Sequence, residues 1–279
     1  MAADLHLHSN YSDGNWTVVD IINYALNKRI SHIAICDHDT ISGLHDAITY
    51  ANSKLKIIPA VEISSRHNLP VNATLDLHIL GYFIDCNNEN LLNVLANQRL
   101  ARYNQSKSIL DNIQARNSDI KINIDTLTNL KQGYSIGTAH LTKAILKLRP
   151  ELNLTAIWNE FISNNSNYFV QRQMLSTLEA IQIINEANGI AILAHPGHLG
   201  KTLKDILPIL IKHGLAGIEV FHPSHNQYLS NYYLKLTQEY NLLVTGGSDC
   251  HGPYAEFPPS LGNIILNDNY FQKILNQKF

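Results

Sequence analysis

The stretch TLEAIQIINEANGIAILAHPGHLGKTLKDILPILIKHGLAGIEVF, residues 177–221, decides the fold class of this chain. Segments with apolar residues at helical spacing alternate here with short, continuous apolar runs, and the pattern continues to residue 245. The expected helices cover 177–187, 203–212 and 227–240, and the expected strands cover 190–194, 217–221 and 242–245. Such alternation predicts a parallel sheet covered by helices, either open or closed into a barrel.

The same rhythm opens the chain and is then interrupted. Further helices are expected at 17–28 and 43–53, and further strands at 4–8, 32–36, 57–63, 75–83 and 262–266. Residues 87–167 contain helical patterns at 91–115, 139–148 and 156–162 and no convincing strand. We therefore expect one α/β domain made of residues 1–86 and 168–279, with an inserted helical subdomain at 87–167.

Composition excludes some classes of protein and favours others. The chain has 279 residues, with 21 Lys and Arg against 23 Asp and Glu and a net charge of -2. This balance excludes a strongly basic nucleic-acid binder of the histone or repressor kind, and we expect no stable binding to duplex nucleic acid. The 14 histidines, in contrast, favour a metal site or an acid–base site.

The cysteines and apolar runs bear on location. The three cysteines form no C-x-x-C pair, which is typical of a protein in a reducing compartment. The first residues lack the basic and apolar regions of a signal peptide. The longest apolar runs, 190–194 and 206–211, are too short to span a bilayer. We expect a cytoplasmic protein with no membrane partner.

Histidines and carboxylates occur at or near the ends of the expected strands. His6 and His8 are two residues apart on a strand and therefore point to the same face, and Asp249 and His251 repeat this spacing. The other candidates of this kind are Asp13, His38, Glu62, His78 and His195. Because the carboxyl ends of parallel strands meet on one surface, these nine side chains could hold two or three divalent ions. Their mixture of imidazole and carboxylate favours Mn, Zn or Fe.

The charge of such a centre suggests its substrate. Three divalent ions would bring a charge of about +6, of which Asp13, Glu62 and Asp249 would offset about half. The remaining positive charge would attract a phosphate group and bind its oxygens. A water molecule bridging the metals, its pKa lowered toward neutrality, would be the nucleophile. His222 ends another expected strand and could contact the leaving group or protonate it.

These motifs resemble those of the polymerase and histidinol phosphatase (PHP) family. The similarity rests on DLHLHS at 4–9, DG at 13–14, DHDT at 37–40, EIS at 62–64, HP at 195–196 and SDCH at 248–251. It implies a distorted, TIM-like (β/α)7 barrel with three metals at the carboxyl ends of the strands. The implied ligands are His6, His8, Glu62 and Asp249 for one metal, Glu62, His78 and His195 for the second, and Asp13, His38 and His251 for the third.

The helical insertion resembles one branch of this family, whose members are small phosphoesterases. That branch acts on 3′,5′-nucleoside bisphosphates such as pAp and on the 5′ ends of short RNA. Arg99 and Arg102, at i and i+3 of a helix, could bind a second phosphate, although an ordinary solvated helix face is the alternative. Where the branch usually has an Arg, this chain has Thr138, and Arg172 could replace it from a later loop.

Three other functions remain open. A phosphatase of small metabolites such as histidinol phosphate is disfavoured by the Arg pair and the insertion. An amidohydrolase acting on C–N bonds typically bridges its metals with a carboxylated Lys, where this chain has Glu62. A degenerate metal-binding or regulatory module would have lost ligands, and none is missing. We expect a metal-dependent phosphoesterase in which Glu62 and Asp249 are essential and His222 assists.

Overall fold

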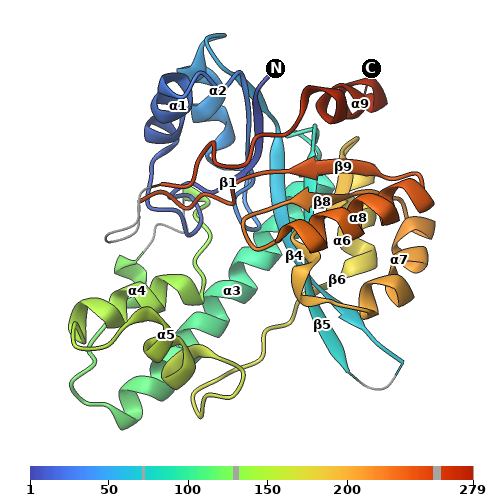
Figure 1. Cartoon of the computed structure of the whole chain (residues 1–279). Helices are drawn as coiled ribbons and strands as arrows, with labels where there is room; N and C mark the ends of the chain where they lie inside the picture. Colours follow the sequence, from blue (N-terminus) through green and yellow to red (C-terminus); the bar gives the residue numbers. More distant parts are fainter. Residues whose placement is uncertain (71–72, 128–131, 254–258, 279) are drawn as a thin grey trace.

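The strands of this α/β protein form two sheets (Figure 1). The computed structural model describes residues 1–70, 73–127, 132–253 and 259–278. One sheet is parallel, with the order β1 (Ala3–Leu7), β2 (His32–Ile35), β3 (Lys56–Ile58). The other is mixed, with the order β6 (Leu175–Ser176), β4 (Ala60–Asn68), β5 (Thr74–Tyr82), β7 (Ile190–Leu193), β8 (Leu215–Phe221), β9 (Leu243–Gly246).

Three expectations about the strands need correction. The sheet is not wholly parallel, because β5 runs antiparallel to both β4 and β7. Only the short segment 69–73 joins β4 to β5, and so short a connection permits a hairpin but no parallel crossover. The strand expected at 262–266 is also wrong, since only Leu266 forms a single bridge, to Ala3. The strand expected at 57–63 divides at Pro59 into β3 and β4.

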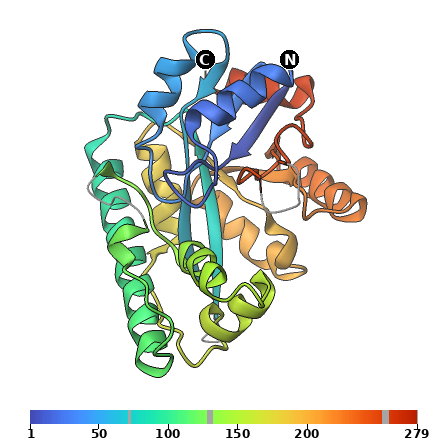
Figure 2. The same cartoon turned by 90° about the vertical axis from the view of Figure 1, so that its left-hand side faces the viewer.

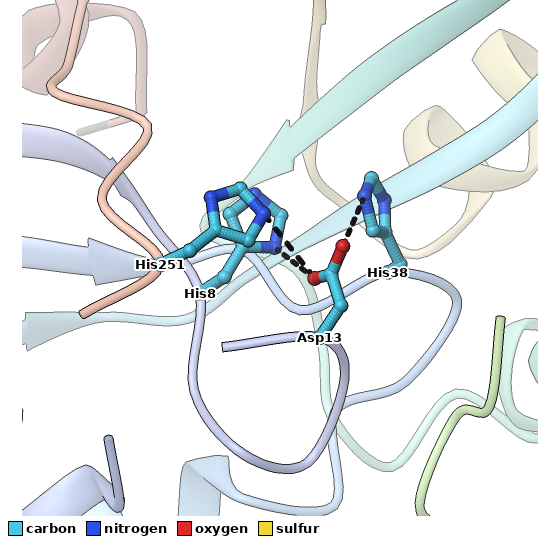
Figure 3. A group of neighbouring side chains, drawn as sticks. All are labelled: His8, Asp13, His38 and His251. Atoms are coloured by element: carbon cyan, nitrogen blue, oxygen red, sulfur yellow. Dashed lines mark ion pairs between the residues drawn. The ribbon is translucent and has the colours of Figure 1, made fainter. Parts of the chain in front are cut away.

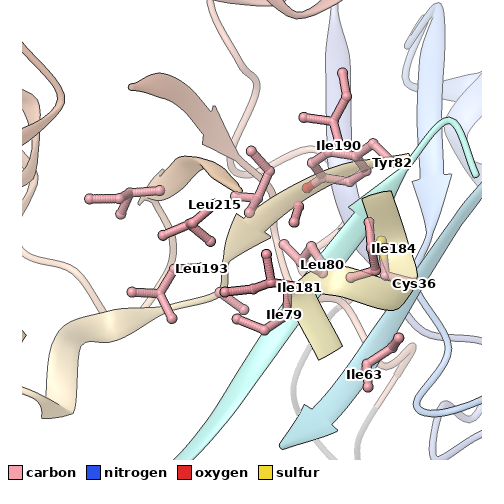
Figure 4. Packing of buried hydrophobic residues seen from close by; sticks show 14 of the residues in the cluster. Cys36, Ile63, Ile79, Leu80, Tyr82, Ile181, Ile184, Ile190, Leu193 and Leu215 are labelled. Carbon is pink, nitrogen blue, oxygen red and sulfur yellow. The ribbon is translucent and has the colours of Figure 1, made fainter. Parts of the chain in front are cut away.

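Amphipathic helices cover the sheets and bury their apolar faces in the core. They are α1 (Val18–Asn27), α2 (Leu44–Ala51), α6 (Thr177–Glu186), α7 (Thr202–Lys212), α8 (Gln227–Glu239) and α9 (Asp268–Lys278). In α6, for example, Ile181 and Ile184 are fully buried and pack with Ile79 and Leu80 of β5 (Figure 4). Burying such side chains stabilises the fold by roughly 1.5–3 kcal/mol each.

A helical segment separates β5 from β6 in the sequence, and no strand occurs among its described residues. It contains α3 (Glu89–Arg116), η1 (Ile124–Thr126), α4 (Thr138–Leu148), α5 (Leu154–Ile157) and a π-helical turn, η3 (Trp158–Ile162). The long α3 runs from the sheets into the rest of the helical segment (Figure 2). Its first half packs on the main core through Leu91 and Leu95. Ile109 and Ile113, in its second half, belong to a separate apolar cluster with α4. No described helix combines the length and apolar character needed to cross a bilayer.

Isolated bridges connect the two sheets at one end. Leu7 at the end of β1 pairs with Cys250, which follows β9, and His38, which follows β2, pairs with Glu62 in β4. The backbone N–H of Asp39 donates to the Glu62 carbonyl at 2.9 Å. The described strands therefore form two sheets that these bridges join, and the ends of β1, β2 and β4 and the segment after β9 lie side by side.

Candidate metal centre

All nine side chains that the sequence suggested as ligands lie together at this end of the sheets. Four groups place one potential ligand atom from each residue within 4.8 Å of the others: His8, Asp13, His38 and His251; His6, Glu62 and His195; His6, His222 and Asp249; and His38, Glu62 and His78. Figure 3 shows the first group, in which residues from four separate parts of the chain face one another. Shared members join the four groups into a single cluster.

Strand geometry and unusual backbone conformations aim these side chains. His6 lies in β1 and His8 directly follows it, and they alternate with Leu5 and Leu7, which are fully buried. His195 lies two residues after β7 and Asp249 three residues after β9, with φ angles of 25° and 47°. Residues other than Gly adopt this left-handed region at a cost of about 1–3 kcal/mol, which is typical of functional sites.

Glu62 lies at the middle of the cluster and is fully buried. Five imidazole nitrogens surround its carboxylate: His78 Nδ1 and His195 Nε2 at 2.9 Å from Oε1, and His38 Nδ1, His8 Nε2 and His6 Nε2 at 3.0, 3.3 and 3.4 Å from Oε2. Burial alone raises the pKa of Glu62, but the neighbouring histidines lower it well below its ordinary value. The carboxylate is therefore ionised at neutral pH and can serve more than one cation.

Asp13 and Asp249 occupy opposite sides of His8. Asp13 Oδ1 lies 3.3 Å from His251 Nε2 and 3.7 Å from His8 Nδ1. Asp249 Oδ1 lies 3.1 Å from His8 Nε2 and 3.5 Å from His6 Nε2. Burial raises the pKa of each carboxyl group, but nearby histidines, His251 and His6 first among them, bring the pKa well below its ordinary value.

The donor atoms fit divalent cations. Four buried atoms of the cluster have no hydrogen-bond partner among the described residues although potential partners lie close by: His8 Nδ1, Asp13 Oδ1, His38 Nδ1 and Glu62 Oε2. Leaving a buried polar atom unpaired costs about 1–3 kcal/mol. Ligands of a tetrahedral ion, each about 2.1 Å from it, lie roughly 3.4 Å apart, which is the spacing these nitrogens and oxygens have. Cations between them would satisfy the unpaired atoms.

Two histidines contact more of the cluster than the family resemblance assigned to them. His8 Nε2 lies 3.1 Å from His6 Nε2 and Asp249 Oδ1 and 3.3 Å from Glu62 Oε2, the set that the resemblance implied, and His8 also groups with Asp13, His38 and His251. His222, expected only to contact a leaving group, lies beside the ligands, with Nε2 at 3.2 Å from Asp249 Oδ2. The assignment of each residue to a particular metal remains a prediction.

Glu219 is a functional candidate that the sequence reasoning missed. It is fully buried in β8, and His6 Nδ1 donates to its Oε1 at 2.9 Å, so that His6 Nε2 faces the cluster. Its other oxygen accepts a hydrogen bond from the backbone N–H of His195 at 2.8 Å. Partners of this kind fix the orientation of metal-binding histidines. A Glu inside the apolar run LAGIEVF was the signal that could have revealed it.

The expected substrate-binding arginines gather around Asp39, which is fully buried. Arg102 donates from Nε to Asp39 Oδ2 and from an Nη atom to Ser64 Oγ, each at 2.5 Å, and Arg172 lies 4.0 Å from Asp39 Oδ2. Arg99 donates to the Asp39 carbonyl at 3.2 Å. Burial lowers the pKa of Arg172, and Arg102 lowers it further.

A cavity of about 380 Å³ lies between the cluster and two of these arginines, Arg102 and Arg172. Asp13, His38 and His78 form one side of it, and Arg66, Arg102 and Arg172 form another. Trp158 and Phe169 line it from the helical segment and the loop that follows. Thr138 and Arg172 face the same cavity, whereas Arg99 is not among its lining residues. The structure thus brings two of the three expected arginines to the cluster.

We expect Glu219→Gln to weaken metal binding by about 10- to 100-fold. Both Glu219 oxygens accept hydrogen bonds, so the amide NH2 would face a donor and His6 would lose its fixed orientation. Metal content after dialysis against a chelator, measured by mass spectrometry, checks this. Exposed Glu186→Gln is the control and should retain its metal. Equal retention in both variants, with the fold intact by circular dichroism, would contradict this role.

Metal binding should tighten as the pH rises. Burial alone lowers the pKa of His8, but Asp249 and Glu62 raise it to about 10. Burial also lowers the pKa of His6, but Glu219, Asp249 and Glu62 outweigh burial and hold this pKa well above its ordinary value. These rings carry protons at pH 7 that a cation must displace, so the apparent affinity should rise about tenfold per pH unit for each proton released.

Calorimetric titration with Zn²⁺ at pH 6 and pH 7, in buffers of different ionisation enthalpy, measures both the affinity and the protons released. Equal affinities at the two values, without proton release, would show that the histidines are already neutral in the metal-free protein.

Residues 4–191 match the PHP domain. The chain is 26% identical over 261 residues to phosphoribosyl 1,2-cyclic phosphate 1,2-diphosphodiesterase of Eggerthella lenta, covering 92% of this chain and 97% of that protein. It is also 26% identical to the 5′-3′ exoribonuclease Rnm of Escherichia coli, over 90% of this chain and 85% of that one. A 3′,5′-nucleoside bisphosphate phosphatase of Chromobacterium violaceum is 26% identical, with coverages of 90% and 87%.

A solved structure agrees with these relatives over the whole chain. The protein from Bifidobacterium adolescentis, proposed to be a metal-dependent phosphoesterase, superposes with a TM-score of 0.85 at 26% identity and covers 99% of this chain and 96% of that one. The domain match spans most of the chain and contains His6, His8, Asp13, His38, Glu62 and His78. This chain belongs to the PHP domain family.

Proposed function

We propose that this protein removes phosphate from 3′,5′-nucleoside bisphosphates such as pAp and acts on the 5′ ends of short RNA. The relatives named above all cleave phosphoric esters, and the proposed reaction belongs to the same class. The chain is a phosphoric ester hydrolase. Two of the three relatives, named as a bisphosphate phosphatase and an exoribonuclease, support a nucleotide substrate.

The cluster would hold two or three divalent ions, and its mixture of imidazole and carboxylate favours Mn, Zn or Fe. Such ions, when bound, lower the pKa of water and offset negative charge on the phosphoryl group. Glu62 would hold more than one of them because imidazoles surround both of its oxygens. Asp249 would bind from the opposite side of His8.

His222 would protonate the leaving oxygen. Its Nε2 lies 3.2 Å from Asp249 Oδ2, and its Nδ1 lies 2.7 Å from Ser224 Oγ. The ring lines a second opening of about 430 Å³ together with His195 and Asp249. This opening borders the same cluster as the substrate cavity but on another side, and from there a proton held on His222 would be donated to the leaving oxygen.

The observation that carries this proposal is the cavity between the cluster and the arginines. Arg102 and Arg172 can bind one phosphate while the cluster holds the other. Trp158 and Phe169 offer aromatic faces on which a base can stack. A substrate whose ribose carries two phosphates and a base matches these three walls, whereas a small metabolite with one phosphate and no base would leave the aromatic wall unused.

We further propose that the strands form a distorted, TIM-like (β/α)7 barrel, with residues 87–167 as an inserted helical subdomain. The bridges from Leu7 to Cys250 and from His38 to Glu62 support a ring that passes through β1, β2, β4, β5, β7, β8 and the segment after β9. In such a ring the cluster lies at the carboxyl ends of the parallel strands, where barrel enzymes have their active sites.

A phosphate-release screen with and without Mn²⁺ tests the proposed reaction. We expect the highest kcat/KM with pAp and 5′-phosphorylated oligoribonucleotides, and lower values with histidinol phosphate and a 1,2-cyclic ribose phosphate. Glu62→Gln should abolish turnover while circular dichroism shows a retained fold, because the cluster loses its central charge. Preference for histidinol phosphate, or activity on amides alone, would contradict the proposal.

Arg172→Gln should lower kcat/KM for pAp by about 10- to 100-fold, which is the effect of losing one charge-assisted hydrogen bond to phosphate. Adenosine monophosphates, which lack the second phosphate, should be affected less than threefold. Arg149→Gln, which removes a charge paired with Asp119 outside the cavity, is the matched control. Equal losses on both substrates would show that Arg172 does not bind a second phosphate.

A further inference from the structure

A second cavity, of about 530 Å³, lies on the other side of the loop that carries Asp13. Its walls are the loop at 10–15, the segment 121–127 and α4. Ser12 lines both this cavity and the one next to the cluster, so the two adjoin. Neither the candidate metal ligands nor the arginines form its walls.

This second cavity has a marked positive charge. Lys121, Lys143 and Lys147 line it, and none of its described lining residues is Asp or Glu. Asp13 and Asp125 belong to the same wall segments but are not among the residues that line the cavity. The chain as a whole has more acidic than basic residues, so three lysines at one cavity depart from its average. Leu148, which is 45% exposed, and Ile122 add an apolar wall. Together these features fit an anion that also carries apolar surface.

Lys143 connects this cavity to the cluster. Its Nζ donates to the Asp13 carbonyl at 2.5 Å and to Asn15 Oδ1 at 2.8 Å. A ligand beside Lys143 therefore lies only one side chain away from the loop that presents Asp13 to His251. A chain of a few nucleotides would extend from the cluster to the second cavity, since each nucleotide is larger than the lysine side chain that separates the cavity from the loop of Asp13.

An aromatic ring also lines the cavity. Tyr134 lines it and stacks on Tyr11, with 4.5 Å between ring centroids. Tyr134 and Asn10 also line a third hollow, where Tyr50 lies. Interleaved lysines and aromatic rings are typical of surfaces that bind single-stranded nucleic acid, because the lysines contact phosphates and the rings stack on bases.

We propose that this lysine-lined cavity binds the downstream nucleotides of a 5′-phosphorylated, single-stranded oligoribonucleotide whose 5′ end lies at the cluster. The inference rests on the proposed function and adds to it a second nucleotide-binding site outside the catalytic cavity. It accounts for how one cluster serves both a mononucleotide and a longer strand. The mononucleotide fills only the first cavity, whereas the strand continues past Ser12 into the second.

The double variant K121Q/K147Q tests the proposal, because both lysines are exposed and lie outside the cluster and its arginines. The control K212Q/K273Q removes two exposed lysines from α7 and α9 and changes the net charge equally. kcat/KM is measured with pAp and with 5′-phosphorylated oligoribonucleotides of two to five nucleotides.

For the wild type we expect kcat/KM to rise with strand length. K121Q/K147Q should lower kcat/KM about tenfold on the longest strand and less than twofold on pAp. On the longest strand, the slope of log(kcat/KM) against log salt concentration should be shallower by roughly 1.4, because two phosphate contacts are lost. The control should match the wild type. Equal losses in variant and control, equal losses on pAp and the longer strand, or a wild-type rate independent of length would each overturn the inference.

Failure of the proposed function has a different signature. If the wild type hydrolyses neither pAp nor any oligoribonucleotide, the proposed reaction is wrong, and the cavity is then tested by binding alone. Fluorescence anisotropy with a 3′-labelled, 5′-phosphorylated pentaribonucleotide measures Kd for the wild type, K121Q/K147Q and K212Q/K273Q. A Kd that K121Q/K147Q leaves unchanged would overturn the second site regardless of turnover.

Discussion

The burial of carboxylates among imidazoles is the constraint on which the rest of this structure depends. Glu62 is fully buried with five ring nitrogens around it, and Asp13 and Asp249 meet others within 4 Å. Removing charges from water costs several kcal/mol per ion, and only opposite charges at close range offset it. Protons on the histidines can do so in the metal-free protein, and divalent cations would do so with better geometry. Either way, the strand ends must hold these groups close together.

Buried carboxylates outside the cluster keep its loops in place. Asp4 accepts backbone N–H groups from Ser248 at 2.8 Å and Gly262 at 2.9 Å, which ties β1 to the segment carrying Asp249. Asp37 accepts the backbone N–H of Ser9 at 2.8 Å and the Ser12 hydroxyl at 2.5 Å, beside the turn that carries Asp13. The loops are therefore held by hydrogen bonds that Asp4 and Asp37 accept, and neither residue belongs to the four ligand groups. These hydrogen bonds limit the geometries that the cluster can adopt.

The helical segment supplies part of the cavity next to this centre. α3 contributes Arg102, and the region of η3 contributes Trp158, so the cavity next to the cluster has walls that the sheets alone would not provide. α4 supplies Lys143, which bonds to the loop of Asp13. Because α3 packs into both apolar clusters, through Leu91 on one side and Ile109 on the other, its arginine is held rigidly relative to the sheets. Under the proposed function, phosphate chemistry and substrate choice would come from different parts of one chain.

By itself the sequence determined most helices and strands, because apolar periodicity depends on local spacing, and it named the nine side chains that the structure brings together. Their assignment as metal ligands stays a prediction. Tertiary structure alone decided that His8 stacks on His251, that Glu219 orients His6, and that Arg172 shares a cavity with Thr138. Each of these depends on distances between residues far apart in the chain. Only the packing of complete elements sets such distances, and no local pattern of residue types encodes them.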